Sequence, residues 1–515
     1  MSKKNQILKF IYENRNALNR LEGIELHEDH GLPRSRRDFL STGLYSAAFG
    51  AILPSTASLL MSTKASAEGL ECPAKVASKG VPFLQFHKAG GGRTTGYGLA
   101  RGNKGTGPEL EAEYTSTTGN SADTNLFVAG VAPDTHPSKN GYEYVKFCGH
   151  YMPKWGYIYQ SAYDYFNPMG TEKMTEISQK VQIISFLHRS PDDNSATMQN
   201  FMPVVRALRG DSDFNVLSAS EGTMRSGLGA VSAFSVTEAS KVLRGTDISG
   251  LIDVGLKGEQ AVTQSFLQEL SSYLSSNLAS EDAKKILGCS SKAASEKILQ
   301  FASGFDLNAD ENYSAVFSDN DQNLGALCHM LKEGLCLTSG RTFGGYDYHN
   351  GTSSGYFTNR EGSQPSGWRA VDYFLRSGTP AVMLWTSDGS TRCANAQEMV
   401  DVNIDGETVN MPLAVNSGDF GRGGCSYLVV VKGDKDIGLK HAQVGHGEAG
   451  GGVAREGNPI GYDQGVCASV ILETIRRLMV VLAEPGNVPT ATFQDITAGL
   501  RFDDNLESYM PIKKV

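Results

Sequence analysis

The chain has 515 residues and a formal net charge of −9 at neutral pH. This acidic balance argues against a protein that binds nucleic acid, because affinity for a phosphate backbone needs concentrated lysine and arginine. No segment is apolar over the roughly 20 residues that a transmembrane helix needs, so we expect no permanent membrane span. The length suits one large domain or two ordinary ones.

The N-terminal region has the pattern of an export signal. Arg36 and Arg37 stand together ahead of Phe39 and Leu40, and a weakly apolar stretch covers residues 42–61. This is the twin-arginine pattern, which is read by the twin-arginine export machinery. Because proline, serine and glycine interrupt the apolar stretch, we expect it to be a removable signal and not an anchor.

A cleavage site follows the apolar stretch. Residues 65–67 read Ala-Ser-Ala, the small residues at alternate positions that a signal peptidase accepts. We therefore expect residues 1–67 to be removed and residues 68–515 to form a single large domain in the periplasm or outside the cell. All eight cysteines lie in this mature part. An oxidising compartment permits disulfides between them, and their pairing is not readable from sequence.

Predicted strands and helices alternate along the mature chain. Residues 81–86 predict a strand that runs into a glycine-rich loop, and residues 181–187 predict a second strand. Residues 97–145, rich in Gly, Thr, Asn and Ser, predict an irregular insertion. Residues 259–303 have apolar positions three and four apart, which predicts a helical insertion of two amphipathic helices.

The second half of the chain repeats the order of helix, strand and polar loop. The predicted elements are a helix at 323–333, a short strand at 335–338, a helix at 371–375, strands at 381–385 and 427–431, and a long helix at 466–483. This alternation predicts an α/β fold with a mostly parallel central sheet sandwiched by helices. Ligands of such sheets bind at the carboxyl ends of the strands.

Acidic and imidazole side chains follow several of these predicted strands. Asp347 and His349 are one residue apart, so in an extended segment both point to the same side and can share a metal ion. Asp388 follows the next strand, and Asp419 lies in a glycine-rich stretch before another. These residue types suit a divalent cation such as zinc, manganese or calcium. The plain alternative is a set of solvated loop residues.

Further polar residues offer catalytic groups. His441 and His446 lie beside a run of glycines, where either can complete a metal shell or act as a general acid; the alternative is a surface loop with two ordinary histidines. His188, after the second predicted strand, is another catalytic candidate. Thr94 and Thr95 offer a hydroxyl nucleophile that a neighbouring metal would activate, or else belong to a simple turn.

The order of these motifs resembles the twin-arginine-exported, sulfatase-like proteins of the alkaline phosphatase superfamily. The stretches that carry the resemblance are residues 83–91 (FLQFHKAGG), 182–196, 324–349 (ending GGYDYH), 385–392 and 418–424. The resemblance implies a helix-sandwiched sheet with a metal-assisted ester-hydrolysis site at the strand ends. Within it, Asp347, His349, Asp388 and Asp419 match metal-ligand positions.

The chain departs from that family at two places. Thr94 and Thr95 stand where relatives usually have an aspartate, and Phe420 stands in place of the histidine of an Asp-His-Gly motif. Loss of an imidazole removes a strong donor with fixed geometry, which His441 or His446 would have to replace. Two functions stay open: a metal-dependent hydrolase of phosphate or sulfate esters, or a non-catalytic envelope or surface protein that binds a glycan or a protein partner.

Overall fold

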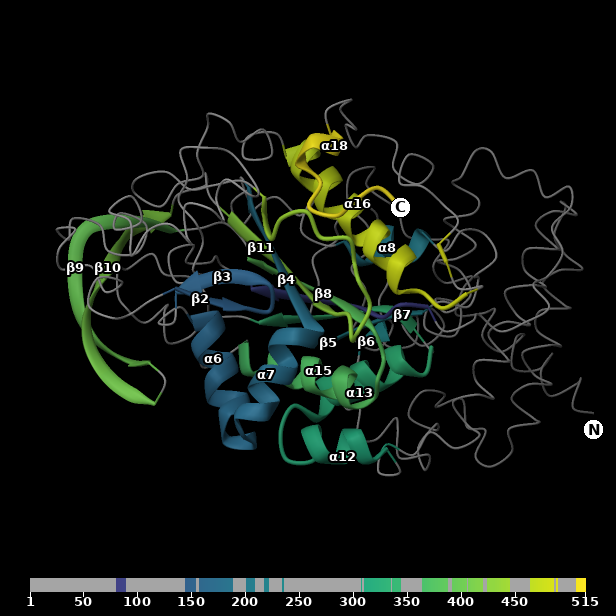
Figure 1. The fold of residues 1–515 in the computed structure, drawn as a ribbon, viewed down its shortest axis with the longest axis horizontal. Helices are drawn as coiled ribbons and strands as arrows, with labels where there is room; N and C mark the ends of the chain where they lie inside the picture. Colours follow the sequence, from purple (N-terminus) through teal and green to yellow (C-terminus); the bar gives the residue numbers. More distant parts are fainter. Residues whose placement is uncertain are drawn as a thin grey trace, which may run out of the picture. The chain divides into compact units, whose positions relative to one another are not determined.

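A computed structural model describes part of the chain (Figure 1). The described residues are 80–88, 144–153, 157–188, 201–208, 217–221, 234–235, 307, 310–334, 336–343, 364–387, 391–404, 406–419, 424–444, 464–485, 488–489 and 506–515. The predicted export signal and the helical insertion at 259–303 lie outside them, as does nearly all of the insertion at 97–145. Among the helices of the described part, none has the length and apolar character to cross a bilayer.

An eight-stranded sheet forms the centre of the described part. Its strands, in spatial order, are β12 (Gln443–Val444), β4 (Val181–His188), β11 (Gly424–Val431), β8 (Ala381–Ser387), β1 (Phe83–Lys88), β7 (Cys336–Phe343), β5 (Leu217–Glu221) and β6 (Phe234–Ser235). Only β11 runs against its neighbours β4 and β8, and every other pair in this sheet is parallel. The α/β prediction is confirmed, with a mixed sheet.

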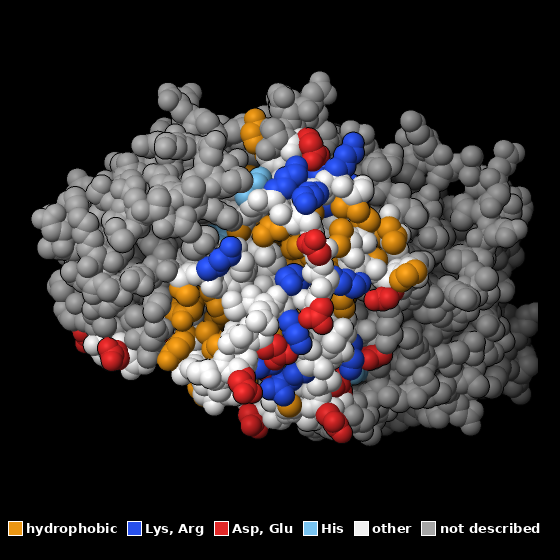
Figure 2. Space-filling model, viewed as in Figure 1, with side chains coloured by type: hydrophobic (Ala, Val, Ile, Leu, Met, Phe, Trp, Pro, Cys, Tyr) orange, Lys and Arg blue, Asp and Glu red, His pale blue; other side chains and the backbone are white. Residues whose placement is uncertain are grey.

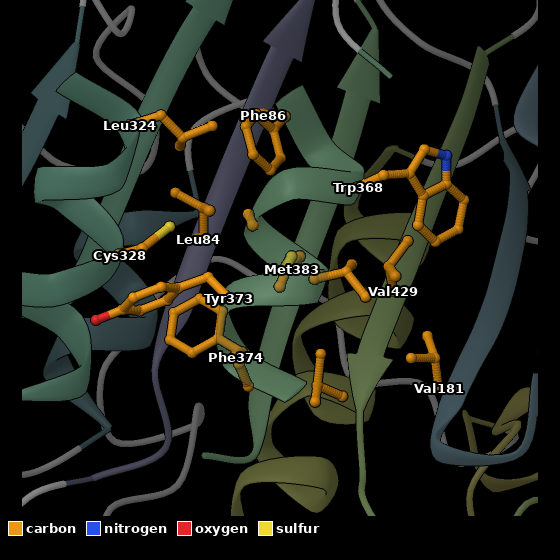
Figure 3. Close-up of a cluster of buried hydrophobic side chains, with 14 of the residues drawn as sticks. Leu84, Phe86, Val181, Leu324, Cys328, Trp368, Tyr373, Phe374, Met383 and Val429 are labelled. Atoms are coloured by element: carbon orange, nitrogen blue, oxygen red, sulfur yellow. The ribbon is translucent and has the colours of Figure 1, made fainter. Parts of the chain in front are cut away.

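The central strands are apolar on both faces because helices cover both. All six residues of β1 are buried, and its apolar side chains alternate between two hydrophobic clusters. Leu84 and Phe86 belong to the first cluster, while Phe83 belongs to the second. Figure 3 shows the first cluster, where Leu84 and Phe86 lie with Trp368 and Cys328, which come from covering helices. Such two-sided burial is typical of strands inside an α/β sheet.

Two groups of helices supply these layers. The first cluster is covered by α6 (Tyr157–Phe166), α7 (Thr171–Lys180), α12 (Glu311–Phe317), α13 (Gln322–Lys332) and α15 (Gln364–Arg376), with the 3-10 helix η4 (Asn167–Met169) between α6 and α7. The second cluster is covered by α8 (Met202–Ala207), α16 (Gln464–Leu482) and α18 (Leu506–Tyr509). On the described part of the face in Figure 2, acidic and basic side chains are interspersed.

Two hairpins lie outside the main sheet. The first pairs β2 (Tyr144–Phe147) with β3 (His150–Pro153) across a two-residue turn in which Cys148 and Gly149 both have positive φ, of 49° and 71°. Positive φ at both turn residues matches the twist of a tight hairpin. The second pairs β9 (Thr391–Ile404) with β10 (Glu407–Asp419), and in sequence it connects β8 to β11.

The structure confirms most of the expected elements that it describes and moves several boundaries. The strands expected at 181–187, 381–385 and 427–431 are present, as are the helices expected at 323–333 and 466–483. The expected short strand at 335–338 is too short, since β7 runs on to Phe343. The glycine-rich stretch that contains Asp419 is in part a strand, because β10 continues to that residue.

Helix α15 begins well before the expected residue 371. Its first turn contains Pro365, which fits there because the first helical N–H groups have no partner within the helix. Gly367 follows, and a Cβ atom at this position would lie 2.4 Å from Cζ2 of Trp385. The glycine therefore allows α15 to approach the indole ring of β8 closely.

We expect Gly367→Ala to lower the free energy of unfolding by about 1–3 kcal/mol, the usual effect of overpacking a filled core. The loss should appear although alanine favours a helix over glycine by about 1 kcal/mol. Chemical denaturation of the variant and of wild type measures it. In a Trp385→Phe background the smaller ring should absorb much of the clash, and an equal loss in both backgrounds would contradict this account.

Candidate functional site

The parallel strands end at one edge of the sheet. β1, β4, β7 and β8 finish there at Lys88, His188, Phe343 and Ser387. Lys88 is in register with Phe343 on one side and with Ser387 on the other. The antiparallel β11 begins at the same edge, because Gly424 pairs with His188. Ligands of α/β sheets bind outside such an edge.

The predicted site residues follow these strand ends in sequence. Outside the described residues lie Thr94, Thr95, Asp347, His349, Asp388 and His446. Asp388 is the residue directly after the end of β8. His188 is the last residue of β4, at the shared edge. Asp419 is the last residue of β10, where it pairs with Thr391 at the base of the second hairpin.

His441 is the predicted ligand whose side chain is described. It lies just before β12, which is the outer strand of the described sheet. The residue is only 5% exposed. Its ring has a backbone hydrogen bond with Tyr509, and the backbone of the adjoining Lys440 bonds to Pro511. Burial, with a smaller contribution from the charge of Lys440, lowers the pKa of His441 to about 4. These contacts tie His441 to the C-terminal segment.

The depressed pKa of His441 predicts a loss of stability in mild acid. The unfolded chain takes up a proton near the ordinary pKa of about 6.5, whereas the folded protein does so only near 4. Stability from this residue is therefore complete above pH 6.5 and falls as the pH drops towards 4, by about 3 kcal/mol in all.

Guanidinium unfolding of wild type and His441→Gln between pH 7.5 and 4 tests this, with the pH values chosen to bracket the two pKa values. Other titrating groups act on both proteins, so the difference between the two curves isolates His441. The variant should lose less stability on acidification. Parallel curves would show that His441 does not titrate in this way.

A buried polar cluster lies at the carboxyl end of the central strands. The register sets His87 beside Thr342 of β7 and Thr386 of β8. His87 is 2% exposed, and its Nδ1 lies 3.2 Å from Oγ1 of Thr386. The buried Gln85 completes the cluster, with Nε2 3.5 Å from the same Oγ1 and with Oε1 accepting the backbone N–H of Phe201 at 2.9 Å. Burying polar groups at this depth costs free energy unless they are hydrogen-bonded.

The sequence-based prediction missed His87, because the strand was expected to end at Phe86. The available signal was a glutamine and a histidine alternating with apolar residues directly ahead of the glycine-rich loop. An alternating pattern of this kind places both polar side chains on one face of a strand. The structure bears this out, since Gln85 and His87 both contact Thr386.

A charged cluster lies near the same end of β7, on the opposite face. Arg341 donates to Oδ1 of Asp321 at 2.8 Å, while Arg369 and Ser366 of α15 donate to Oδ2. The guanidinium of Arg341 also covers the ring of Phe343. Burial alone would raise the pKa of Asp321, but these charges and hydrogen bonds hold it below its usual value. Two guanidinium groups around one carboxylate leave the cluster positive.

A carboxylate and an imidazole also meet between the helices. Asp310 accepts hydrogen bonds from His329, Lys332 and Tyr373, and its other oxygen caps the first turn of α12. Although burial opposes ionisation, these donors hold the pKa of Asp310 well below its usual range. The group joins α12, α13 and α15. It lies at the end of α13 that leads into the start of β7. It is therefore remote from the carboxyl edge and stabilises helix packing.

No protein-family model, curated protein or solved structure matches the chain. The geometry that bears on function is therefore the shared strand edge, with the His87 cluster on one face and the Arg341 cluster on the other. Among the described residues, no group of three or more His, Cys, Asp or Glu side chains is arranged to hold a metal ion.

Proposed function

We propose that the mature protein is an exported, metal-dependent hydrolase of phosphate or sulfate esters with an alkaline phosphatase-like architecture. One observation carries the proposal: β1, β4, β7 and β8 end at a single edge of the sheet. In sequence, the candidate nucleophiles and acidic groups come shortly after three of these strand ends. Thr94 and Thr95 follow β1, Asp347 and His349 follow β7, and Asp388 follows β8.

The side chains of this set have the chemistry of a cation site. Asp347, His349 and Asp388 offer carboxylate and imidazole donors, which suit zinc or manganese and, with more oxygen ligands, calcium. A bound divalent cation supplies polarisation of the ester oxygen and a lowered pKa for a coordinated hydroxyl or water. Thr94 or Thr95 would present the hydroxyl nucleophile, and His188, at the end of β4, would move protons.

The charged cluster suits an anionic substrate. The planar guanidinium forks of Arg341 and Arg369 match the oxygen geometry of phosphate and sulfate groups. A net positive cluster near the shared edge would favour an anionic ester over a neutral one.

The sequence also supports a second candidate, a non-catalytic envelope protein that binds a glycan or a protein partner. Its specific observation is Phe420, which stands where the related pattern has a histidine ligand. On this reading the sheet and its loops would remain as a binding scaffold. Metal content and turnover separate the two candidates, because a scaffold requires neither.

The test is metal analysis of the purified protein together with hydrolysis of p-nitrophenyl phosphate and p-nitrophenyl sulfate. We expect bound divalent metal in wild type, and Asp347→Ala and Asp388→Asn should each lower kcat/KM by more than about 100-fold and reduce the metal content. Asp434→Ala is the matched control, because Asp434 follows the end of β11 at the opposite edge of the sheet and is exposed. Wild-type protein without metal and without turnover would favour the scaffold instead.

A further inference from the structure

Most sulfur-containing side chains whose exposure the structure describes are buried. The cysteines among them are Cys148, Cys328 and Cys336. The methionines that are 2% exposed or less are Met152, Met202, Met330, Met383, Met479 and Met510. Met174 is partly buried. Met169, the last residue of η4, is 45% exposed. Within this set, a dissolved oxidant therefore reaches the sulfur of Met169 most readily.

The thioether of Met169 lies against a guanidinium group that is itself held in place. Its Sδ is 4.0 Å from Nη2 of Arg376, in the last turn of α15. The Nε of the same guanidinium donates to Oδ2 of Asp372 at 3.0 Å. The side chain of Asp372 is 1% exposed, and its other oxygen forms an ion pair with Lys173 of α7 at 3.1 Å. Because a buried carboxylate holds the guanidinium through Nε, Nη2 stays beside the sulfur.

Oxidation would turn this weak contact into a strong one. A thioether sulfur is a weak hydrogen-bond acceptor. A sulfoxide is polar, and its oxygen would accept a charge-assisted hydrogen bond from a guanidinium. The surroundings leave room for the added oxygen. At the neighbouring Gly170, no described atom lies within 4 Å of an ideal Cβ position, so the junction of η4 and α7 is open.

We propose that Met169 is a reversible oxidation site, at which a peroxide converts the thioether into a sulfoxide that accepts a hydrogen bond from Arg376. The sulfur lone pair attacks one oxygen of hydrogen peroxide, the O–O bond breaks, and the other oxygen leaves as water. Sulfur is oxidised and the peroxide is reduced. A methionine sulfoxide reductase reverses the step, with a dithiol oxidised to a disulfide and the oxygen released as water.

This site would take up an oxidant without disturbing the core. Methionine sulfoxide disrupts packing where the side chain belongs to an apolar core, because the oxidised group is polar. At Met169 the oxygen would face solvent and a cation instead. The site is also separate from the proposed hydrolase site. Arg376 precedes the start of β8, at the end of the sheet opposite the shared edge.

The experiment treats the purified protein with dilute hydrogen peroxide and follows the methionine-containing peptides by mass spectrometry. Met169 should gain one oxygen atom at least about 10-fold faster than the buried Met330 and Met383, since susceptibility follows exposure. Methionine sulfoxide reductase with dithiothreitol should then remove that oxygen from the folded protein. Equal oxidation rates at the three methionines, or no repair of Met169 by the reductase, would overturn a reversible site at this residue.

Thermal melting before and after oxidation tests the role of Arg376. Met169→Leu, made in wild type and in Arg376→Gln, is the matched control, because it keeps an apolar side chain and reports oxidation at all other sites. Relative to this control, oxidation of Met169 should leave the melting temperature of wild type unchanged or raise it, and should lower that of Arg376→Gln.

An equal change in both backgrounds would overturn the hydrogen bond to Arg376. Should Arg376→Gln not fold, Arg376→Lys takes its place, because lysine keeps a positive charge for Asp372 but lacks Nη2. Hydrolysis of p-nitrophenyl esters does not enter either readout. Failure of this proposal therefore leaves the hydrolase proposal to its own test.

Discussion

The pairing of β1 between β7 and β8 is the constraint on which the described structure depends. β1 is buried along its whole length and in register with a parallel strand on each side, so its position sets that of both neighbours. Segments that are hundreds of residues apart in the chain then end at the same level. Ligands of α/β sheets bind outside the edge so formed.

In β8 the buried polar side chain lies near that end of the strand. Along β8, Ala381 to Trp385 are apolar and buried, and the buried Thr386 comes just before the strand ends. Burying a hydroxyl, an amide and an imidazole together is unfavourable unless each is hydrogen-bonded. Gln85 and His87 meet this requirement in part through Thr386, to which both are hydrogen-bonded at the edge where ligands of α/β sheets bind.

The elements that sequence predicted best are those with a strong local pattern. The continuous apolar run at 427–431 and the periodic helix that ends near residue 483 were both expected from the spacing of their apolar residues. The start of α15 was missed because Pro365 and Gly367 normally discourage a helix. The first hairpin was missed because its turn has Cys148 at positive φ, where asparagine or glycine is usual. The end of β1 was set two residues short, and this error hid His87.

The sequence by itself determined the types of the elements, their approximate order and the kinds of polar residue that follow the strands. These are local properties, since apolar periodicity and turn residues act within a few positions of the chain. Only the tertiary structure decided the strand order, the opposite direction of β11, the burial of His441 against the C-terminal segment and the orientation of His87. Each of these depends on contacts between residues far apart in sequence, and no local pattern encodes which distant strand lies alongside.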